Sequence, residues 1–151
     1  MAHPTATILV TGHSLGAALA THAAVDIKRQ ISTDKNPVTF YSYGSPRVGN
    51  KVFADYIMTL FPNGSYQRVT HFTDTAVHTP LRVMGFQHAG NEVWYLNDGQ
   101  DMTYVTCENG VGLPENDKCS NSNYAILDKN SHIIYVGHFI AGMCKSVAFL
   151  A

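Results

Sequence analysis

The chain has 151 residues, of which 45% are hydrophobic and 14% are charged, and its formal net charge is -1. This composition excludes an intrinsically disordered chain and a coiled coil, and the lack of a basic block excludes an electrostatic surface for nucleic acid. The length fits one domain with a single core. The chain does not open with a signal-peptide pattern, and its most apolar stretch, 133–151, is interrupted by His138 and Lys145. We therefore expect neither a signal peptide nor a transmembrane segment within these residues.

In chain order, patterns typical of strands alternate with patterns typical of helices. Runs rich in β-branched and aromatic residues predict strands at 5–11, 38–43 and 66–72, followed by a hairpin of strands at 92–96 and 102–106. Apolar residues at helical spacing predict helices at 17–31, 52–60 and 133–150, the last broken near Gly142. Strands that alternate with helices predict an α/β fold with a mostly parallel sheet.

The segment between the first predicted strand and the first predicted helix reads Gly12-His13-Ser14-Leu15-Gly16. A Gly-x-Ser-x-Gly sequence in this setting is typical of a nucleophile elbow, in which the glycines let strand and helix approach closely. Such a turn would expose the Ser14 hydroxyl and aim the Leu15 N–H at a developing oxyanion, above the positive end of the helix. The alternative is a glycine-rich turn with a capping serine.

A serine nucleophile needs an acid that follows it in the chain and orients a later histidine. Asp74 comes two residues after the third predicted strand, where the carboxyl ends of parallel strands gather near the elbow. We therefore choose Asp74 as this acid. The alternative is that Asp74 only forms an Asx turn after the strand.

Chain order leaves four of the eight histidines as candidates for the base, namely His78, His88, His132 and His138. We favour His132, because it lies in a polar loop that opens onto an apolar segment and so has room to reach Ser14. His138, inside the predicted terminal helix, is the second candidate. His13 adjoins the nucleophile, and we expect it to point to the opposite side of the turn.

The chain has three cysteines, and Cys107 and Cys119 bracket a polar loop that a disulfide would close. Three free thiols are the alternative, and no spacing of Cys and His resembles a zinc site. The odd cysteine is Cys144. Apolar residues that follow Asp74 either line a substrate pocket or pack in the core; they are Leu81, Val83, Met84 and Phe86.

Taken together, several segments resemble one known family. They are 10–18 around Ser14, 43–50 (Tyr-Gly-Ser-Pro-Arg-Val-Gly-Asn), 85–94, 107–122 and 132–137. These segments are similar to the class 3 lipases, the fungal-type triacylglycerol lipases and feruloyl esterases of the α/β-hydrolase fold. The resemblance implies hydrolysis of carboxylic esters through an acyl-enzyme, without a metal or organic cofactor. It implies Ser14 as nucleophile, Asp74 as acid and His132 as base, with the Leu15 N–H as an oxyanion donor.

The resemblance covers nearly the whole chain but only about the C-terminal half of the family, so we interpret 1–151 as a single, partial α/β-hydrolase domain. It further implies a Cys107–Cys119 disulfide and a cysteine outside this chain that pairs with Cys144. It also implies that the substrate is an ester or lipid at a lipid–water interface and that the full-length protein is secreted. The family's further strands, its lid and its second oxyanion donor would lie upstream, so we expect the first strand to be an exposed sheet edge. Two alternatives remain: an esterase for feruloyl or other soluble esters, and a non-catalytic, truncated remnant that either binds a partner or has no folded role.

Overall fold

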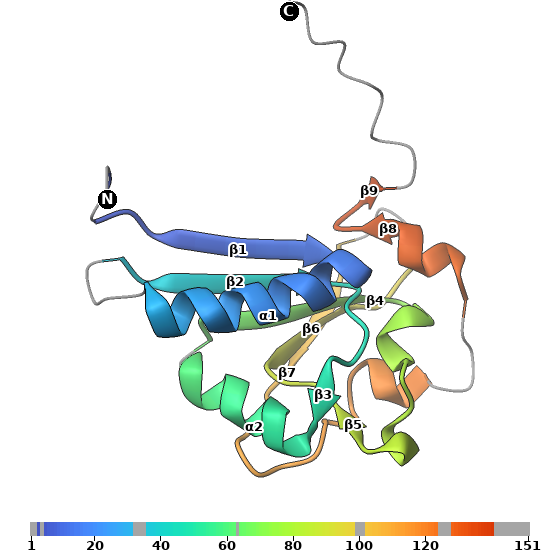
Figure 1. Ribbon diagram of the computed structural model, residues 1–151. Coiled ribbons are helices and arrows are strands. Elements are labelled where there is room, and N and C mark those ends of the chain that lie inside the picture. Colours follow the sequence, from blue (N-terminus) through green and yellow to red (C-terminus); the bar gives the residue numbers. More distant parts are fainter. Residues whose placement is uncertain are drawn as a thin grey trace, which may run out of the picture.

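The computed structural model describes residues 3, 5–31, 36–62, 64–98, 102–123 and 128–140. These residues form a five-stranded sheet in the order β1-β2-β4-β6-β7, in which the first four strands are parallel and β7 is antiparallel (Figure 1). The strands are β1 (Ile8–His13), β2 (Val38–Tyr43), β4 (Tyr66–His71), β6 (Asn91–Tyr95) and β7 (Tyr104–Cys107). The mostly parallel α/β sheet that the sequence predicts is therefore confirmed.

Two helices, α1 (Leu15–Gln30) and α2 (Lys51–Leu60), pack on the same face of the sheet (Figure 1). Small residues of α1, among them Ala24, let it lie close to Phe40 of β2, and Ile57 of α2 completes this core. The ring of Phe40 stacks on that of Tyr66, with 4.5 Å between centroids. The burial of these apolar side chains is the main source of stability for this layer.

Shorter elements form the rest of the described chain. The short strands β3 (Gly49–Asn50) and β5 (Phe86–Gln87) form one antiparallel pair. The short strands β8 (Ile134–Tyr135) and β9 (His138–Phe139) form another. The 3-10 helices are η1 (Ala76–His78), η2 (Arg82–Met84), η3 (Ser120–Asn123) and η4 (Asn130–Ile133).

The predicted terminal helix at 133–150 is wrong over the residues that the structure describes. The chain there forms η4 and then the β8–β9 pair. Val136 and Gly137 both have positive φ, 51° and 72°, which an α-helix does not accommodate. The remainder of that prediction, 141–150, lies outside the described residues, as does Cys144.

Within the described residues β1 is an edge strand, as expected, and Leu9 on it is 61% exposed. The helices cover the opposite face from Leu9. An open hollow of about 380 Å³ on that uncovered face is lined by tyrosines and valines, among them Tyr41, Tyr95 and Tyr104. Among the described helices there is none with the length and apolar character needed to cross a membrane.

Candidate active site

Ser14 lies at the sharp turn that connects β1 to α1. Its φ of 57° and ψ of -132° belong to a region that only glycine adopts without strain. The turn is tight enough that a Cβ on Gly12 would lie 2.4 Å from the carbonyl oxygen of Gly16. A Cβ on Gly16 itself would meet nothing within 4 Å, so close approach explains the first glycine of the motif and not the second.

Leu15 is the first residue of α1, so its N–H belongs to the first turn, where backbone donors lack partners within the helix. The carbonyl of Ser14 already accepts the N–H of Ala17 at 2.9 Å. The helix N-terminus and the Leu15 N–H therefore lie beside the Ser14 hydroxyl. Both favour negative charge at this point.

His132, on η4, bridges Ser14 and Asp74. Its Nε2 lies 2.7 Å from Oγ of Ser14, and its Nδ1 lies 2.9 Å from Oδ2 and 3.0 Å from Oδ1 of Asp74. Because a carboxylate only accepts, Nδ1–H donates to Asp74, and Nε2 is left to accept the hydroxyl proton of Ser14. The side chain of His132 is 21% exposed, whereas that of Asp74 is buried. The fold thus brings together the three residues that the sequence analysis selected.

Asp74 has two further hydrogen bonds. Its Oδ1 accepts the N–H of Ala76 at 2.8 Å, and its Oδ2 accepts the hydroxyl of Tyr135. The bond from Ala76 is the Asx-turn geometry weighed above, so the turn and the contact with His132 coexist in one residue. Burial, together with the charge of Asp74, holds the pKa of Tyr135 well above its ordinary value of 10.0, and the hydroxyl therefore stays a donor.

Gly44 leaves the space that this arrangement needs. Its φ is 55°, and a Cβ there would lie 2.8 Å from the hydroxyl oxygen of Tyr135 and 3.0 Å from Oδ2 of Asp74. A side chain at this position would displace one of the two. Gly44 belongs to segment 43–50, which the sequence analysis singled out without assigning it a task.

The expectation that His13 points away from the site is wrong. β1 continues through His13, and strand alternation places its side chain on the sheet face that η4 and β8 cross. Its Nε2–H donates to the backbone carbonyl of His132 at 2.9 Å, and the two rings lie 4.7 Å apart. Burial is the main cause that lowers the pKa of His13, and the neutral ring still supplies this donor.

Two more side chains that the sequence analysis missed hold the segment that carries His132. Nδ1–H of His71 donates to the carbonyl of Ser131 at 2.9 Å, and the hydroxyls of Thr73 and Ser131 are 3.1 Å apart. The position of both residues at the end of β4, just before Asp74, was the available signal. These contacts fix the height of η4 above the sheet.

The remaining histidine candidates lie elsewhere. His138 is an exposed residue of β9. His78 is a buried residue of the loop that carries Asp74, and His88 is buried against that loop, where its Nε2–H donates to the carbonyl of Val77 at 2.8 Å. An open apolar hollow of about 500 Å³ lies beside the site, lined in part by His13, Tyr135 and Ile140.

The four apolar residues after Asp74 do not pack in the core. Val83 and Met84 are largely exposed, and Phe86 is half-buried. Leu81 and Val83 line a separate hollow with Asp117 and Asn121. Among the described residues no group of three or more His, Cys, Asp or Glu side chains is arranged to hold a metal ion.

The chain resembles known lipases in sequence and in structure. Residues 1–84 match the family model described as Lipase (class 3). A secreted mono- and diacylglycerol lipase of Fusarium solani is 37% identical over 89% of this chain and 38% of its own length. Lipase II from Rhizopus niveus has a TM-score of 0.81 at 34% identity, over 91% of this chain and 50% of that one.

A third relative is a triacylglycerol lipase whose structure is described as having a serine protease triad at its catalytic centre. Its TM-score is 0.77 at 32% identity, over 90% of this chain and 49% of that one. The chain therefore spans between 38% and 50% of the length of these relatives. The parallel sheet with its covering helices is therefore the α/β-hydrolase fold of these lipases.

Proposed function

This chain belongs to the class 3 lipase family, and we propose that Ser14, His132 and Asp74 are the catalytic triad of a carboxylic ester hydrolase that acts on acylglycerols. The observation that carries the proposal is the 2.7 Å contact between Ser14 Oγ and His132 Nε2, with Asp74 on the other ring nitrogen. This is the order and the orientation in which a serine hydroxyl is activated.

In the proposed reaction His132 takes the proton of Ser14 as Oγ attacks the ester carbonyl. The oxyanion forms beside the Leu15 N–H and the N-terminus of α1, and both stabilise its charge. His132 then gives the proton to the leaving alcohol, and water releases the acyl group by the same steps. Asp74 stabilises the imidazolium throughout. The loss of one oxyanion donor typically slows the turnover of such enzymes by about 10²–10³-fold. A second donor beside the Leu15 N–H would therefore raise the rate greatly.

The names of the relatives support the proposed substrate class. One is named a mono- and diacylglycerol lipase and another a triacylglycerol lipase, so we propose an acylglycerol at a lipid–water interface. The Fusarium relative is named as secreted, and a Cys107–Cys119 disulfide is typical of an oxidising compartment, so we propose that the full-length protein is secreted. Turnover of acylglycerols and of feruloyl esters, measured side by side, distinguishes a lipase from a soluble-ester hydrolase.

The decisive test is labelling by a fluorophosphonate, which reacts with a serine only when its base and oxyanion site are assembled. We expect labelling of the wild-type chain and its loss in Ser14→Ala and His132→Ala. His138→Ala is the matched control, because His138 was the second candidate base and lies exposed on β9. Labelling that survives His132→Ala, or a cooperatively folded wild-type chain that is not labelled, contradicts the proposal and favours the non-catalytic alternative.

A further inference from the structure

Arg47, in the same segment as Gly44, is buried beneath the loop that carries Asp74. Its Nη1 donates to the backbone carbonyls of His78 at 2.6 Å and Pro80 at 2.9 Å. Its own backbone N–H donates to the carbonyl of the residue between them, Thr79, at 2.7 Å. Arg47 thus binds three successive carbonyls at the end of the loop 72–80, which we call the acid loop.

The other side of the guanidinium faces Glu115. Nε and Nη2 of Arg47 lie 2.7 Å and 2.8 Å from the two carboxylate oxygens, and the two side chains are 0% and 1% exposed. Glu115 also accepts the backbone N–H of His88 at 2.6 Å and a hydrogen bond from Asn121 at 3.1 Å. Burial alone would raise the pKa of Glu115, but the bond from Arg47 and the nearby positive charges lower it, so the pair is ionic.

A buried ion pair of this kind is a poor source of stability, because desolvation costs about as much as the attraction returns. It does fix geometry. The fork of Arg47 matches the carboxylate on one side and spans two carbonyls on the other, which the single ammonium of a lysine does not do.

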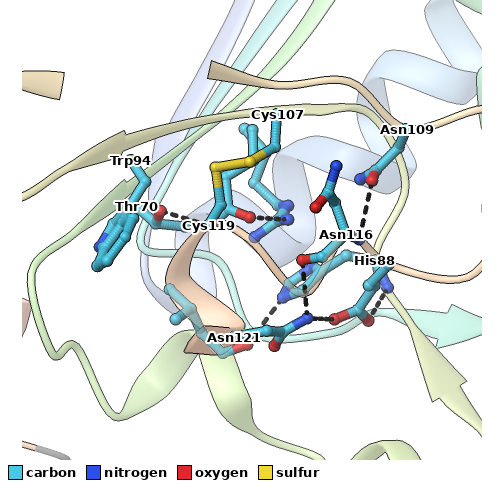
Figure 2. Close-up of polar contacts among 12 residues, drawn as sticks. Thr70, His88, Trp94, Cys107, Asn109, Asn116, Cys119 and Asn121 are labelled. Carbon is cyan, nitrogen blue, oxygen red and sulfur yellow. Dashed lines mark hydrogen bonds and ion pairs between the residues drawn. A yellow bond between two sulfur atoms is a disulfide. The ribbon is translucent and has the colours of Figure 1, made fainter. Parts of the chain in front are cut away.

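The beginning of the acid loop is also held by a side-chain donor. Nε1–H of Trp94 donates to the carbonyl of Phe72 at 2.9 Å, and Trp94 packs against the disulfide of Cys107 and Cys119. Figure 2 shows Trp94 beside this disulfide, with His88 and Asn121 in the adjoining polar network. Segment 107–119 therefore supports the acid loop at both ends, through Trp94 at Phe72 and through Glu115 and Arg47 at 78–80.

We propose that Arg47 and Glu115 are positioning residues, which fix the end of the acid loop and thereby hold Asp74 against Nδ1 of His132. The inference rests on the proposed function for its catalytic consequence. It assigns a task to the arginine of segment 43–50, which contacts neither Ser14 nor His132 and acts only through the loop.

The test compares two buried Arg–Glu pairs. Glu115→Gln weakens the pair under the acid loop, and Glu92→Gln weakens a control pair, Arg68–Glu92, whose side chains are 2% and 1% exposed. In the control pair Arg68 of β4 donates to Glu92 of β6, and the hydroxyl of Thr70 also donates to Glu92 at 2.6 Å. Arg47→Lys is the second test variant. It keeps the charge next to Glu115 and removes the fork.

Two readouts are needed, the fluorophosphonate labelling rate per folded molecule and the low-field proton resonance of Nδ1–H on His132. A shift of about 1 Å in a reacting group costs up to 10²-fold in rate. We expect Glu115→Gln and Arg47→Lys to slow labelling about tenfold or more and to broaden or lose the resonance. Glu92→Gln should lower the unfolding midpoint by about as much as the two test variants do. It should leave the labelling rate per folded molecule and the Nδ1–H resonance unchanged.

Equal effects of Glu115→Gln and Glu92→Gln on the two readouts would overturn the inference, as would a wild-type labelling rate in both test variants. The resonance separates this inference from the proposed function. If the wild-type chain shows the resonance without being labelled, the proposed function fails while the variants still decide whether the pair positions Asp74. A folded wild-type chain with neither signal overturns both.

Discussion

Tyr135 donates its hydroxyl to Oδ2 of Asp74, the carboxylate oxygen that also lies 2.9 Å from Nδ1 of His132. Oδ1 accepts the N–H of Ala76, so both oxygens of this buried carboxylate have protein donors. The tyrosine extends the line of contacts from Ser14 through His132 and Asp74 by one residue. Its hydroxyl holds the same carboxylate oxygen that His132 contacts.

Tyr135→Phe keeps the ring and removes only this donor. We expect labelling by the fluorophosphonate to slow about tenfold and the free energy of unfolding to fall by about 1–2 kcal/mol, the typical cost of losing a buried hydrogen bond to a charged group. Stopped-time labelling and urea unfolding measure the two effects. Tyr95→Phe, which removes the hydroxyl of a half-buried tyrosine on β6, is the control and should leave the labelling rate unchanged. A wild-type rate in Tyr135→Phe would show that Asp74 is held without it.

Acid should destabilise the fold between pH 6.5 and 5. Burial lowers the pKa of His88 well below 6.5 and also lowers the pKa values of His13 and His78. Between pH 6.5 and 5 the unfolded chain therefore binds more protons than the folded chain. The contribution of these neutral histidines to the free energy of unfolding is complete above pH 6.5 and is lost as the pH falls. Each such group contributes a slope of up to about 1.4 kcal/mol per pH unit.

Urea unfolding at several pH values between 5 and 6.5 measures this slope. The window ends at pH 5 because Glu115, whose pKa is lowered from 4.5, adds its own loss of stability in stronger acid. His88→Gln should flatten the dependence of stability on pH, because it removes the titrating ring. The amide Nε2 of the glutamine can still donate to the carbonyl of Val77, so the hydrogen bond is kept. An unchanged slope in that variant would mean that His88 titrates normally in the folded chain.

Backbone strain at Ser14 predicts that the nucleophile lowers stability. A non-glycine residue at φ 57° and ψ -132° costs on the order of 1–3 kcal/mol, and glycine avoids that cost. We therefore expect Ser14→Gly to unfold at a higher urea concentration than Ser14→Ala, by about 1 kcal/mol or more in free energy. Neither variant can be labelled, so only stability is compared. Equal midpoints would argue that the turn relaxes when the hydroxyl is absent.

The two glycines of the elbow should respond differently to the same substitution. Gly12→Ala forces a Cβ to within 2.4 Å of the Gly16 carbonyl oxygen, so β1 and α1 must move apart, and we expect a loss of about 1–3 kcal/mol. Gly16→Ala places its methyl group in open space in the first turn of α1, and alanine is favoured over glycine by up to about 0.5–1 kcal/mol, the value for a helix interior. Thermal unfolding of the two variants should therefore shift in opposite directions.

Local patterns predicted much of this fold and left out the long-range contacts. Residues 38–43 were predicted as a strand because they are rich in β-branched and aromatic residues, and they form β2, in which buried and half-buried residues alternate. The elbow motif and the chain order of nucleophile, acid and base, with the polar loop around His132, selected Ser14, Asp74 and His132, and the structure contains the contacts of His132 with the other two. The spacing of apolar residues after Ile133 is also compatible with a helix, so it did not reveal the turn at Val136. There tertiary packing overrides the local pattern.

The residues that sequence reasoning missed act across large separations. Tyr135 reaches Asp74 over 61 positions, and Arg47 reaches Glu115 over 68. Neither contact follows from a window of neighbouring residues. The orientation of His13 was mistaken for a related reason, because it depends on β1 continuing one residue past Gly12.

Ser14 and His132 are 118 positions apart in the chain, yet their side chains meet. Under the proposed mechanism a molecule in which β1, the acid loop and η4 have not yet docked carries an ordinary alcohol instead of a nucleophile. Newly made chains would consequently be harmless to the lipids of the cell that makes them until folding is nearly finished. Fluorophosphonate labelling would then count completely assembled molecules, and its time course after dilution from urea would follow the last step of folding.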